Sequence, residues 1–155
     1  MENKKIIIGS RRSKLALIYA ERAKIELLKN SDLKNVEIKS ITTTGDTIND
    51  VRVSEHGGKG AFCKKIENEL LNNNIDVAVH ALKDMPTDET DGLITNSFLE
   101  RNDPREILIS KDSKHLKDLA PNSIIGTSSF RREFQIRKIR KDLKCKLIRG
   151  NVDSR

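Results

Sequence analysis

A lysine and an aspartate, Lys83 and Asp84, stand side by side shortly after the apolar run Val77 to Val79. That run is uncharged and rich in valine, which predicts a short buried strand. Pro86 follows and disfavours a helical continuation. Ligands bind at the carboxyl ends of strands in open α/β sheets, so this pair could offer one small molecule both a cation and a carboxylate. The alternative is a solvated turn whose ion pair is worth about 0–1 kcal/mol.

Two strand-to-helix turns share one pattern. Residues 7–12 and residues 124–132 each combine a β-branched strand end, a glycine, hydroxyl side chains and an Arg-Arg pair before a predicted helix. The glycine permits close approach of a ligand, the hydroxyls can cap the helix, and the helix N-terminus carries partial positive charge. Each turn is therefore a candidate anion site, and an ordinary turn with exposed arginines is the alternative.

Arginine is the residue type that gathers at these predicted strand ends and turns. One carboxylate engages one or two arginines, through charge-assisted hydrogen bonds worth about 1.5–3 kcal/mol each. There are more arginines here than one carboxylate can use, so a ligand with several carboxylates explains them better. They are Arg11, Arg12, Arg131, Arg132, Arg149 and Arg155.

The chain is basic, with a net charge of +7 from 30 Lys and Arg against 23 Asp and Glu. This excess favours anionic ligands without choosing between nucleic acids, lipids and metabolites. Nucleic acid is disfavoured because the chain has no Trp and one Tyr, and single strands are bound by stacking on aromatic side chains. No membrane partner is expected, since the apolar run Ile6 to Ile8 is too short for a signal peptide or a membrane span.

The two cysteines, Cys63 and Cys145, are far apart in the sequence and have no metal-type or redox spacing. Reduced thiols are typical of a cytoplasmic protein, and we expect no metal site. Both cysteines are expected to be buried core thiols.

Apolar periodicity predicts a first α/β lobe in residues 1–99, and its strand-helix-strand order implies parallel pairing. A long polar loop at 47–60 contains Gly57-Gly58-Lys59-Gly60 and could close over a site, but its glycine spacing is not that of a P-loop. The predicted strands are Ile6–Ile8, Val36–Ile41, Val77–Val79 and Leu93–Phe98, and the predicted helices open at Arg11–Ser13 and at Phe62, ending at Asn30–Asp32 and at Leu71.

The composition changes at Glu100 to Glu106, where nearly every residue is charged and Pro104 interrupts the segment. Such a segment is typical of a crossover between lobes, so residues 100–155 are predicted to begin a second α/β lobe. About 50 residues rarely supply a sufficient core, so this lobe is expected to be incomplete. Its predicted strands are Ile107–Ile109, Ile124–Ile125 and Lys146–Ile148, with a short helical piece at His115–Leu119, a helix at Ser129–Arg140 and a turn at Arg149–Asn151.

Four segments together resemble one enzyme family, and the similarity runs in register from Ile6 to Arg155. These segments are Gly57–Gly60, Ala78–Pro86, Gly126–Arg132 and Arg149–Val152. With them the chain resembles the porphobilinogen deaminases, also called hydroxymethylbilane synthases. The resemblance implies lobes like those of type II periplasmic binding proteins, with mixed, mainly parallel sheets. It also implies a transferase of tetrapyrrole (heme and porphyrin) biosynthesis, which condenses four porphobilinogen molecules into hydroxymethylbilane and releases ammonia, on a dipyrromethane cofactor held by a cysteine thioether.

The same resemblance assigns roles to the polar residues at the predicted turns. Asp84 would be the catalytic carboxylate, stabilising the cationic methylene-pyrrole formed when ammonia leaves. The acetate and propionate groups of the pyrroles would be the carboxylates that the arginines bind. The cofactor would be held by Lys83, Thr127, Ser128, Ser129, Arg131, Arg132 and Arg155. The substrate would be held by Arg11, Ser13, Arg149, Gly150 and Asn151, with Lys59 and Phe62 in the lid.

The chain departs from the family pattern at Ala81, where serine is usual, and at Phe130, where leucine is more common. The resemblance also places the cofactor-bearing cysteine beyond Arg155. We therefore expect the chain, as an N-terminal half, to be inactive alone, whether it is a cloned fragment, a truncated gene product or half of a split enzyme. The expected partner is porphobilinogen, with no nucleic acid or membrane, and the expected state is a cytoplasmic monomer.

Two other functions remain open for these residues. One is a two-lobed module that binds an organic anion without catalysis, and the other is a basic nucleic-acid-binding domain. The carboxylate of Asp84 separates catalysis from simple anion binding, which gains nothing from a negative charge in the cleft. Salt dependence distinguishes nucleic-acid binding from the other two functions, because binding to a phosphate backbone weakens steeply as the salt concentration rises.

Overall fold

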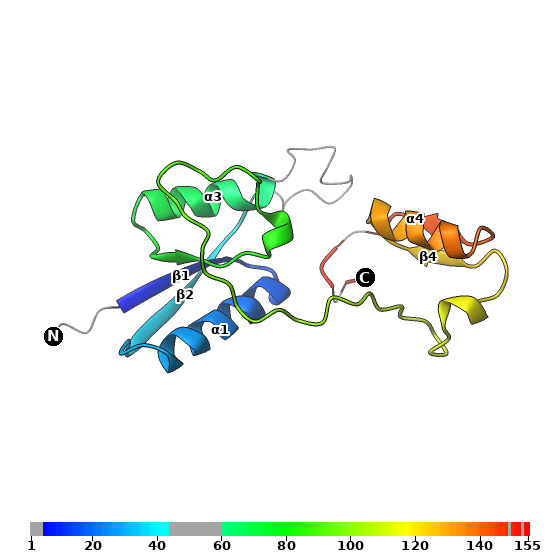
Figure 1. Cartoon of the computed structure of the whole chain (residues 1–155), viewed down its shortest axis with the longest axis horizontal. Helices are drawn as coiled ribbons and strands as arrows, with labels where there is room; N and C mark the ends of the chain where they lie inside the picture. Colours follow the sequence, from blue (N-terminus) through cyan, green and yellow to red (C-terminus); the bar gives the residue numbers. More distant parts are fainter. Residues whose placement is uncertain (1–4, 44–59, 149, 153) are drawn as a thin grey trace. The chain divides into compact units, whose positions relative to one another are not determined.

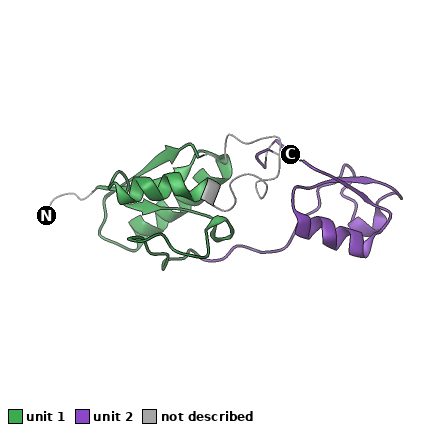
Figure 2. Ribbon diagram, turned by 90° about the horizontal axis from the view of Figure 1, so that it is seen from above, with its two compact units in different colours: residues 1–99 green, residues 100–155 purple. Residues whose placement is uncertain are grey.

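The computed structural model describes residues 5–43, 60–148, 150–152 and 154–155. The chain divides into two compact units, Met1–Leu99 and Glu100–Arg155, which Figure 2 colours separately. Both units combine helices with parallel strands, so the predicted α/β class with mainly parallel sheets is confirmed. The assignment of residues 1–99 and 100–155 to two lobes stays a prediction.

The first unit is organised around strand β1 (Lys5–Arg11), which lies between β2 (Asn35–Ile41) and β3 (Val77–Ala78). Both neighbours are parallel to β1, which pairs with β2 along its whole length and with β3 at Ile8 and Gly9. These three predicted strands are confirmed, although β1 continues through the residues expected to end it. Parallel pairing aligns the carboxyl ends of the strands at one edge of the sheet.

Two helices cover opposite faces of this sheet (Figure 1). Helix α1 (Lys14–Lys29) begins after Ser13, whose side-chain oxygen accepts a hydrogen bond from the Ala16 N–H at 3.4 Å. Helix α3 (Gly60–Leu71) confirms the second predicted helix. The predicted loop at 47–60 lies outside the described residues except for Gly60. None of the helices in the described part of the chain is both long and apolar enough to span a bilayer.

The core of the first unit has two halves, because successive residues of a strand point to opposite faces of a sheet. Ile8 packs with Ala20 and Ala23 of α1 on one face. Ile7 packs on the other face, in the cluster around Ile66 of α3. The central strand is therefore buried from both sides, and its carboxyl end is held between two helices.

Gly9 lies where the second half of the core leaves no space for a side chain. A Cβ atom at this position would lie 2.3 Å from Ile75 Cδ1 and 3.2 Å from Ile41 Cδ1. Both isoleucines are buried, so neither has free space to move into. Close packing, and not an unusual backbone conformation, therefore requires glycine here.

The second unit has two parallel strands, β4 (Ile124–Gly126) and β5 (Lys144–Lys146), joined by helix α4 (Phe130–Ile139). Among its described residues, the buried apolar side chains are those of Ile125 and Leu143. Both phenylalanines of α4 are more than half exposed, at 61% and 69%. Because burial of apolar area is the main stabilising contribution in most folds, polar contacts carry unusual weight in this unit.

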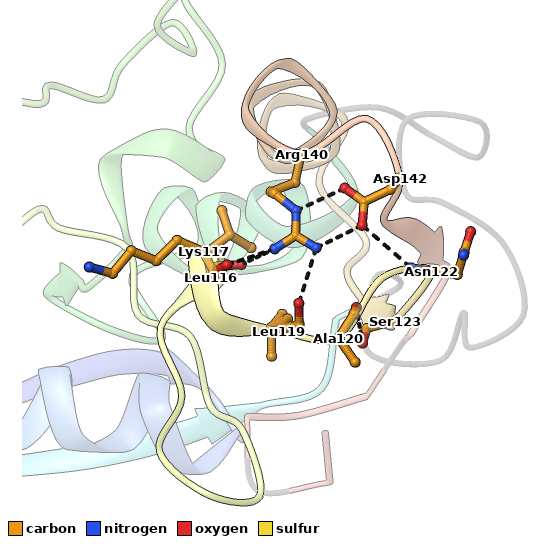
Figure 3. Close-up of polar contacts among 8 residues, drawn as sticks. All are labelled: Leu116, Lys117, Leu119, Ala120, Asn122, Ser123, Arg140 and Asp142. Carbon is orange, nitrogen blue, oxygen red and sulfur yellow. Dashed lines mark hydrogen bonds and ion pairs between the residues drawn. The ribbon is translucent and has the colours of Figure 1, made fainter.

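Arg140 joins the end of α4 to the segment before β4 (Figure 3). Its guanidinium donates hydrogen bonds to three backbone carbonyls at 2.9–3.1 Å, those of Leu116, Lys117 and Leu119. Its Nε and Nη2 also pair with the two carboxylate oxygens of Asp142, at 2.8 and 2.7 Å. The hydrogen bonds from this guanidinium hold the pKa of Asp142 down to about 2.

Three expectations about strands need correction. Leu93–Phe98 forms no strand, and neither does Ile107–Ile109, whose end residues are 83% and 86% exposed. Apolar composition favours a strand, but a strand forms only where a neighbour completes its hydrogen bonds. The strand predicted at Lys146–Ile148 is β5, which begins and ends two residues earlier. The short helical piece near residues 115–119 is confirmed as the 3-10 helix η3 (Leu116–Asp118).

The crowding at Gly9 predicts that Gly9→Ala destabilises the fold by about 1–3 kcal/mol, because an added methyl group overpacks a filled core. Urea denaturation followed by circular dichroism measures this change. Ile75→Val removes the methyl group that the new side chain would meet, and costs about 0.5–1.5 kcal/mol by itself. The double variant should lose less free energy of unfolding than the sum of the losses in the two single variants. Losses that simply add would contradict the crowding.

Arg140→Lys should loosen the second unit, because a lysine cannot reach three carbonyls and a carboxylate at once. Hydrogen exchange at the amides of β4 and β5 should become faster. Arg137→Lys, which alters an ion pair with Glu133 on α4, is the matched control and should leave the exchange rates unchanged. Equal exchange in both variants would show that Arg140 is dispensable.

The same ion pair predicts an acid limit for the second unit. The pKa of Asp142 is lower in the folded chain than in the unfolded chain, so its charge stabilises the fold at pH values above its unfolded pKa of about 4. That contribution should be lost as the pH falls from about 4 towards 2, and the Arg140→Lys variant should show less of this acid sensitivity.

Candidate active site

The carboxyl edge of the first sheet gathers several residues that the sequence singles out. β1 ends at Arg11, and β3 leads into the 3-10 helix η2 (Leu82–Asp84). The Asp84 N–H donates to the carbonyl of Ala81 at 2.9 Å, which closes the turn. Lys83 is exposed and Asp84 is half-buried. The turn therefore presents a cation and a carboxylate on a backbone that is held in place.

Arg11 and Phe62 connect β1 to the first turn of α3. The guanidinium carbon of Arg11 lies 4.0 Å from the centroid of the Phe62 ring, a cation–π contact worth about 0.5–1 kcal/mol at an exposed site. This contact helps to keep Arg11 at the sheet edge. Lys59, the other residue expected in the lid, lies outside the described residues.

Cys63 contacts the turn that carries Asp84. Its thiol donates a hydrogen bond to the Asp84 carbonyl oxygen at 3.2 Å. Its sulfur also lies 3.7 Å from Met85 Sδ and 3.9 Å from His80 Nδ1. Cys63 is fully buried, as expected, whereas Cys145 is only half-buried. The hydrogen bond from the Cys63 thiol thus holds in place the backbone that carries the Asp84 carboxylate.

Burial changes the titration of this cluster. Desolvation raises the pKa of the Cys63 thiol to about 11, and the carboxylates of Glu67 and Asp84 add to the rise. Desolvation lowers the pKa of His80, whose buried Nε2 has no hydrogen-bond partner among the described residues. Because burial disfavours both charged forms, the thiol and the imidazole are neutral at pH 7.

In the second unit, the turn between β4 and α4 uses its hydroxyl groups to begin the helix. Thr127 is buried, and its Oγ1 accepts a hydrogen bond from the Ser129 N–H at 3.2 Å. Ser129 caps α4 by accepting from the Arg132 N–H at 3.3 Å. Ser128 is half-buried between them. The partial positive charge at the start of α4 adds to that of the adjacent Arg131 and Arg132.

Glu106 pairs with both arginines of this turn. Its Oε1 accepts a hydrogen bond from Arg131, and its Oε2 lies 2.6 Å from Arg132 Nε. The hydrogen bond from Arg131, together with the two positive charges, lowers the pKa of Glu106. The arginine side chains stay accessible, with exposures of 59% and 46%. The two arginines are thus arranged to hold a carboxylate, which in this structure comes from the chain itself.

The C-terminal residues form a turn of their own. Gly150 has a φ of 112°, a conformation that favours glycine, and its carbonyl accepts a hydrogen bond from Arg155 Nε at 2.8 Å. The Asn151 carbonyl accepts from the backbone N–H groups of Ser154 and Arg155 at 3.0 and 3.2 Å. Arg149 lies outside the described residues.

Most of the predicted site residues thus fall into two groups. The Asp84 group consists of Arg11, Phe62, Lys83 and Asp84 in the first unit, and the Arg131 group of Thr127, Ser128, Ser129, Arg131 and Arg132 in the second. That both groups face one cleft stays a prediction, because they belong to different units. Sequence reasoning missed the contacts of Cys63 and Glu106. Each joins segments far apart in the chain, and no spacing pattern reveals such a contact.

The chain is an α/β protein with parallel sheets, in which the first unit has a carboxylate and cations at the carboxyl edge of its sheet and the second has a helix start that holds a carboxylate between two arginines, groups suited to binding an organic anion. The sequence model of one family, "Porphobilinogen deaminase, dipyromethane cofactor binding domain", matches residues 6–155. The chain belongs to the porphobilinogen deaminase family.

Relatives with that name are similar over nearly the whole chain. The chain is 48% identical over 150 residues to the porphobilinogen deaminase of Geobacillus kaustophilus, 50% over 153 residues to that of Bacillus mycoides, and 47% over 152 residues to that of Chlorobaculum tepidum. These alignments cover 97–98% of this chain but 48–49% of the relatives. The chain therefore spans about half the length of the curated relatives it matches.

The contact of Glu106 with the two arginines predicts that Glu106→Gln tightens binding of a soluble dipyrromethane that carries acetate and propionate groups. Its carboxylates would no longer compete with Glu106. An exposed ion pair is worth about 0.2–1 kcal/mol, so Kd from titration calorimetry should fall by up to about fivefold. Glu133→Gln removes one negative charge from α4 and is the matched control. Weaker binding by Glu106→Gln alone would show that Glu106 supports the ligand instead.

Proposed function

We propose that this chain is the part of a hydroxymethylbilane synthase that binds the cofactor and carries the catalytic carboxylate. Such an enzyme condenses four porphobilinogen molecules into a linear tetrapyrrole and releases ammonia. The observation that carries the proposal is the Asp84 carboxylate, held beside Lys83 at the same sheet edge as Arg11. Membership of the porphobilinogen deaminase family supports the same activity.

Asp84 is the proposed catalytic residue. When ammonia leaves porphobilinogen, the methylene-pyrrole carries a positive charge, which a fixed carboxylate stabilises. The backbone of Asp84 is fixed by the Ala81 carbonyl and by the Cys63 thiol, so the carboxylate needs little reorganisation as this charge develops. Its oxygens can also accept hydrogen bonds from pyrrole N–H groups.

The cationic side chains are proposed to hold the acetate and propionate groups of the pyrroles. The planar fork of a guanidinium matches the two oxygens of a carboxylate. Arg11 is positioned for this by its contact with Phe62. The remaining residues proposed for the substrate are Ser13, Arg149, Gly150 and Asn151, with Lys59 and Phe62 in a lid.

The Arg131 group fits a ligand that carries carboxylates, because its arginines already bind the carboxylate of Glu106. When bound, a dipyrromethane supplies the pyrrole to which the first substrate unit is joined. Exchange of Glu106 for a cofactor carboxylate would keep the charge balance of the site. The residues proposed to hold the cofactor are Lys83, Thr127, Ser128, Ser129, Arg131, Arg132 and Arg155.

We also propose that residues 1–99 are one lobe of the type II periplasmic-binding-protein kind and that residues 100–155 begin a second, in a cytoplasmic monomer. Parallel strands connected by helices in both units support this architecture. An organic-anion-binding module without catalysis is the alternative. It predicts tighter ligand binding when Asp84 loses its charge, because that charge repels a carboxylate ligand.

Asp84→Asn tests the proposal in a chimera in which this chain replaces the matching segment of the Geobacillus kaustophilus relative. The kcat for linear tetrapyrrole formation should fall by about 10²–10³-fold, as expected for loss of one electrostatic stabiliser. Asp88→Asn, at an exposed position, is the matched control and should keep the parent activity. Equal kcat values for the two variants would remove Asp84 from its role.

The 155-residue chain alone provides a second arm of this experiment. We expect it to form no linear tetrapyrrole from porphobilinogen and to keep its unmodified mass, because the resemblance places the cofactor-bearing cysteine outside it. Intact-mass spectrometry detects any pyrrole adduct. A stable adduct on Cys63 or Cys145, or repeated turnover by the chain alone, would contradict this expectation.

A further inference from the structure

We propose that Cys63 Sγ, His80 Nδ1 and Met85 Sδ form a binding site for a soft monovalent metal ion, Cu(I). The Cys63 sulfur lies 3.9 Å from the imidazole nitrogen and 3.7 Å from the thioether sulfur. The three donors come from α3, from the segment between β3 and η2, and from the residue after η2. This site is separate from the proposed deaminase function and does not depend on it.

The spacing of the donor atoms is that of ligands on one metal ion. With metal–nitrogen and metal–sulfur bonds of about 2.0 and 2.3 Å, tetrahedral to trigonal angles place nitrogen and sulfur ligands about 3.5–3.7 Å apart and two sulfur ligands about 3.8–4.0 Å apart. The separations of 3.9 Å from Cys63 Sγ to His80 Nδ1 and 3.7 Å from Cys63 Sγ to Met85 Sδ lie close to these ranges. The thiol sulfur is thus near ligand spacing from each of the other two donors.

The chemistry of the donors selects the ion. Thiolate and thioether sulfur are soft ligands that favour Cu(I), and imidazole also suits copper. Among the described residues, no group of three or more His, Cys, Asp or Glu side chains is arranged to hold a metal. The proposed set exists only because Met85 completes it, and a thioether is a poor ligand for Mg²⁺ or Ca²⁺.

The charge balance also favours a monovalent ion. Binding exchanges the proton of the Cys63 thiol for the metal, so Cys–SH and Cu(I) give a thiolate-bound copper and one released proton. The net charge of the buried site is then unchanged, whereas a divalent ion would add a positive charge. The charged groups that act on this site are Arg11 from β1, Glu67 from α3 and Asp84 from η2.

Anaerobic titration of the reduced 155-residue chain with Cu(I), buffered by the chromophoric chelator bicinchoninate, tests the site. We expect one Cu(I) per chain. Loss of an outer-shell partner of a metal typically weakens binding by about 10–100-fold. Loss of a direct ligand should weaken binding at least as much, and we expect this for Cys63→Val, His80→Gln and Met85→Leu. Cys145→Ser is the matched control and should change the affinity by less than twofold. Circular dichroism checks that each variant stays folded, and Cys63→Ser provides a second replacement if the valine variant does not.

X-ray absorption at the copper edge identifies the ligands directly in the parent chain. Two sulfur atoms and one nitrogen atom around each copper would support the site, and Met85→Leu should remove one sulfur. Loss of Cu(I) binding in Cys145→Ser would overturn the proposed site. Unchanged Cu(I) binding in both His80→Gln and Met85→Leu would overturn it too. Absence of Cu(I) binding to the folded chain would overturn it as well.

Discussion

Pairing of β1 with a parallel strand on each side is the interaction on which the first unit depends. Parallel strands need crossover connections, and α1 and α3 supply them while covering the two faces of the sheet. The carboxyl ends of β1 and β3 then lie at one edge, so Arg11 and the Asp84 turn come together from distant parts of the chain. On one face of this sheet the packed side chains of Ile41 and Ile75 leave no space for a side chain at Gly9.

Arginine serves two purposes in the second unit, because its planar fork can bind either carbonyls or carboxylates. Arg140 uses its donors to hold three carbonyls and Asp142, which compensates for a small apolar core. Arg131 and Arg132 instead pair with Glu106 at the start of α4 and remain accessible. In the proposed function a ligand carboxylate would exchange with Glu106, whereas the carbonyls bound by Arg140 belong to the fold. The arginines of this unit therefore differ in their partners and not in residue type.

The Asp84 turn shows how a partly buried, neutral cluster can support a charged group. Cys63 donates to the Asp84 carbonyl, and His80 and Met85 lie against the same sulfur. Because the thiol and imidazole carry no charge at neutral pH, they fix the backbone without adding a second negative charge near the carboxylate. The three side chains that brace this turn are also the three soft donors proposed to bind Cu(I).

The sequence by itself determined the α/β class, the parallel pairing and most helices and strands, because apolar periodicity and helix caps such as Ser13 and Ser129 are local signals. Its motifs also pointed to the family. It predicted strands at Leu93–Phe98 and Ile107–Ile109 wrongly, since an apolar run does not reveal whether a partner strand exists. Only the tertiary structure decided that Cys63 lies against Asp84 and that Glu106 pairs with the arginines of α4. These contacts join segments distant in the chain, and they arise from packing that no local pattern encodes.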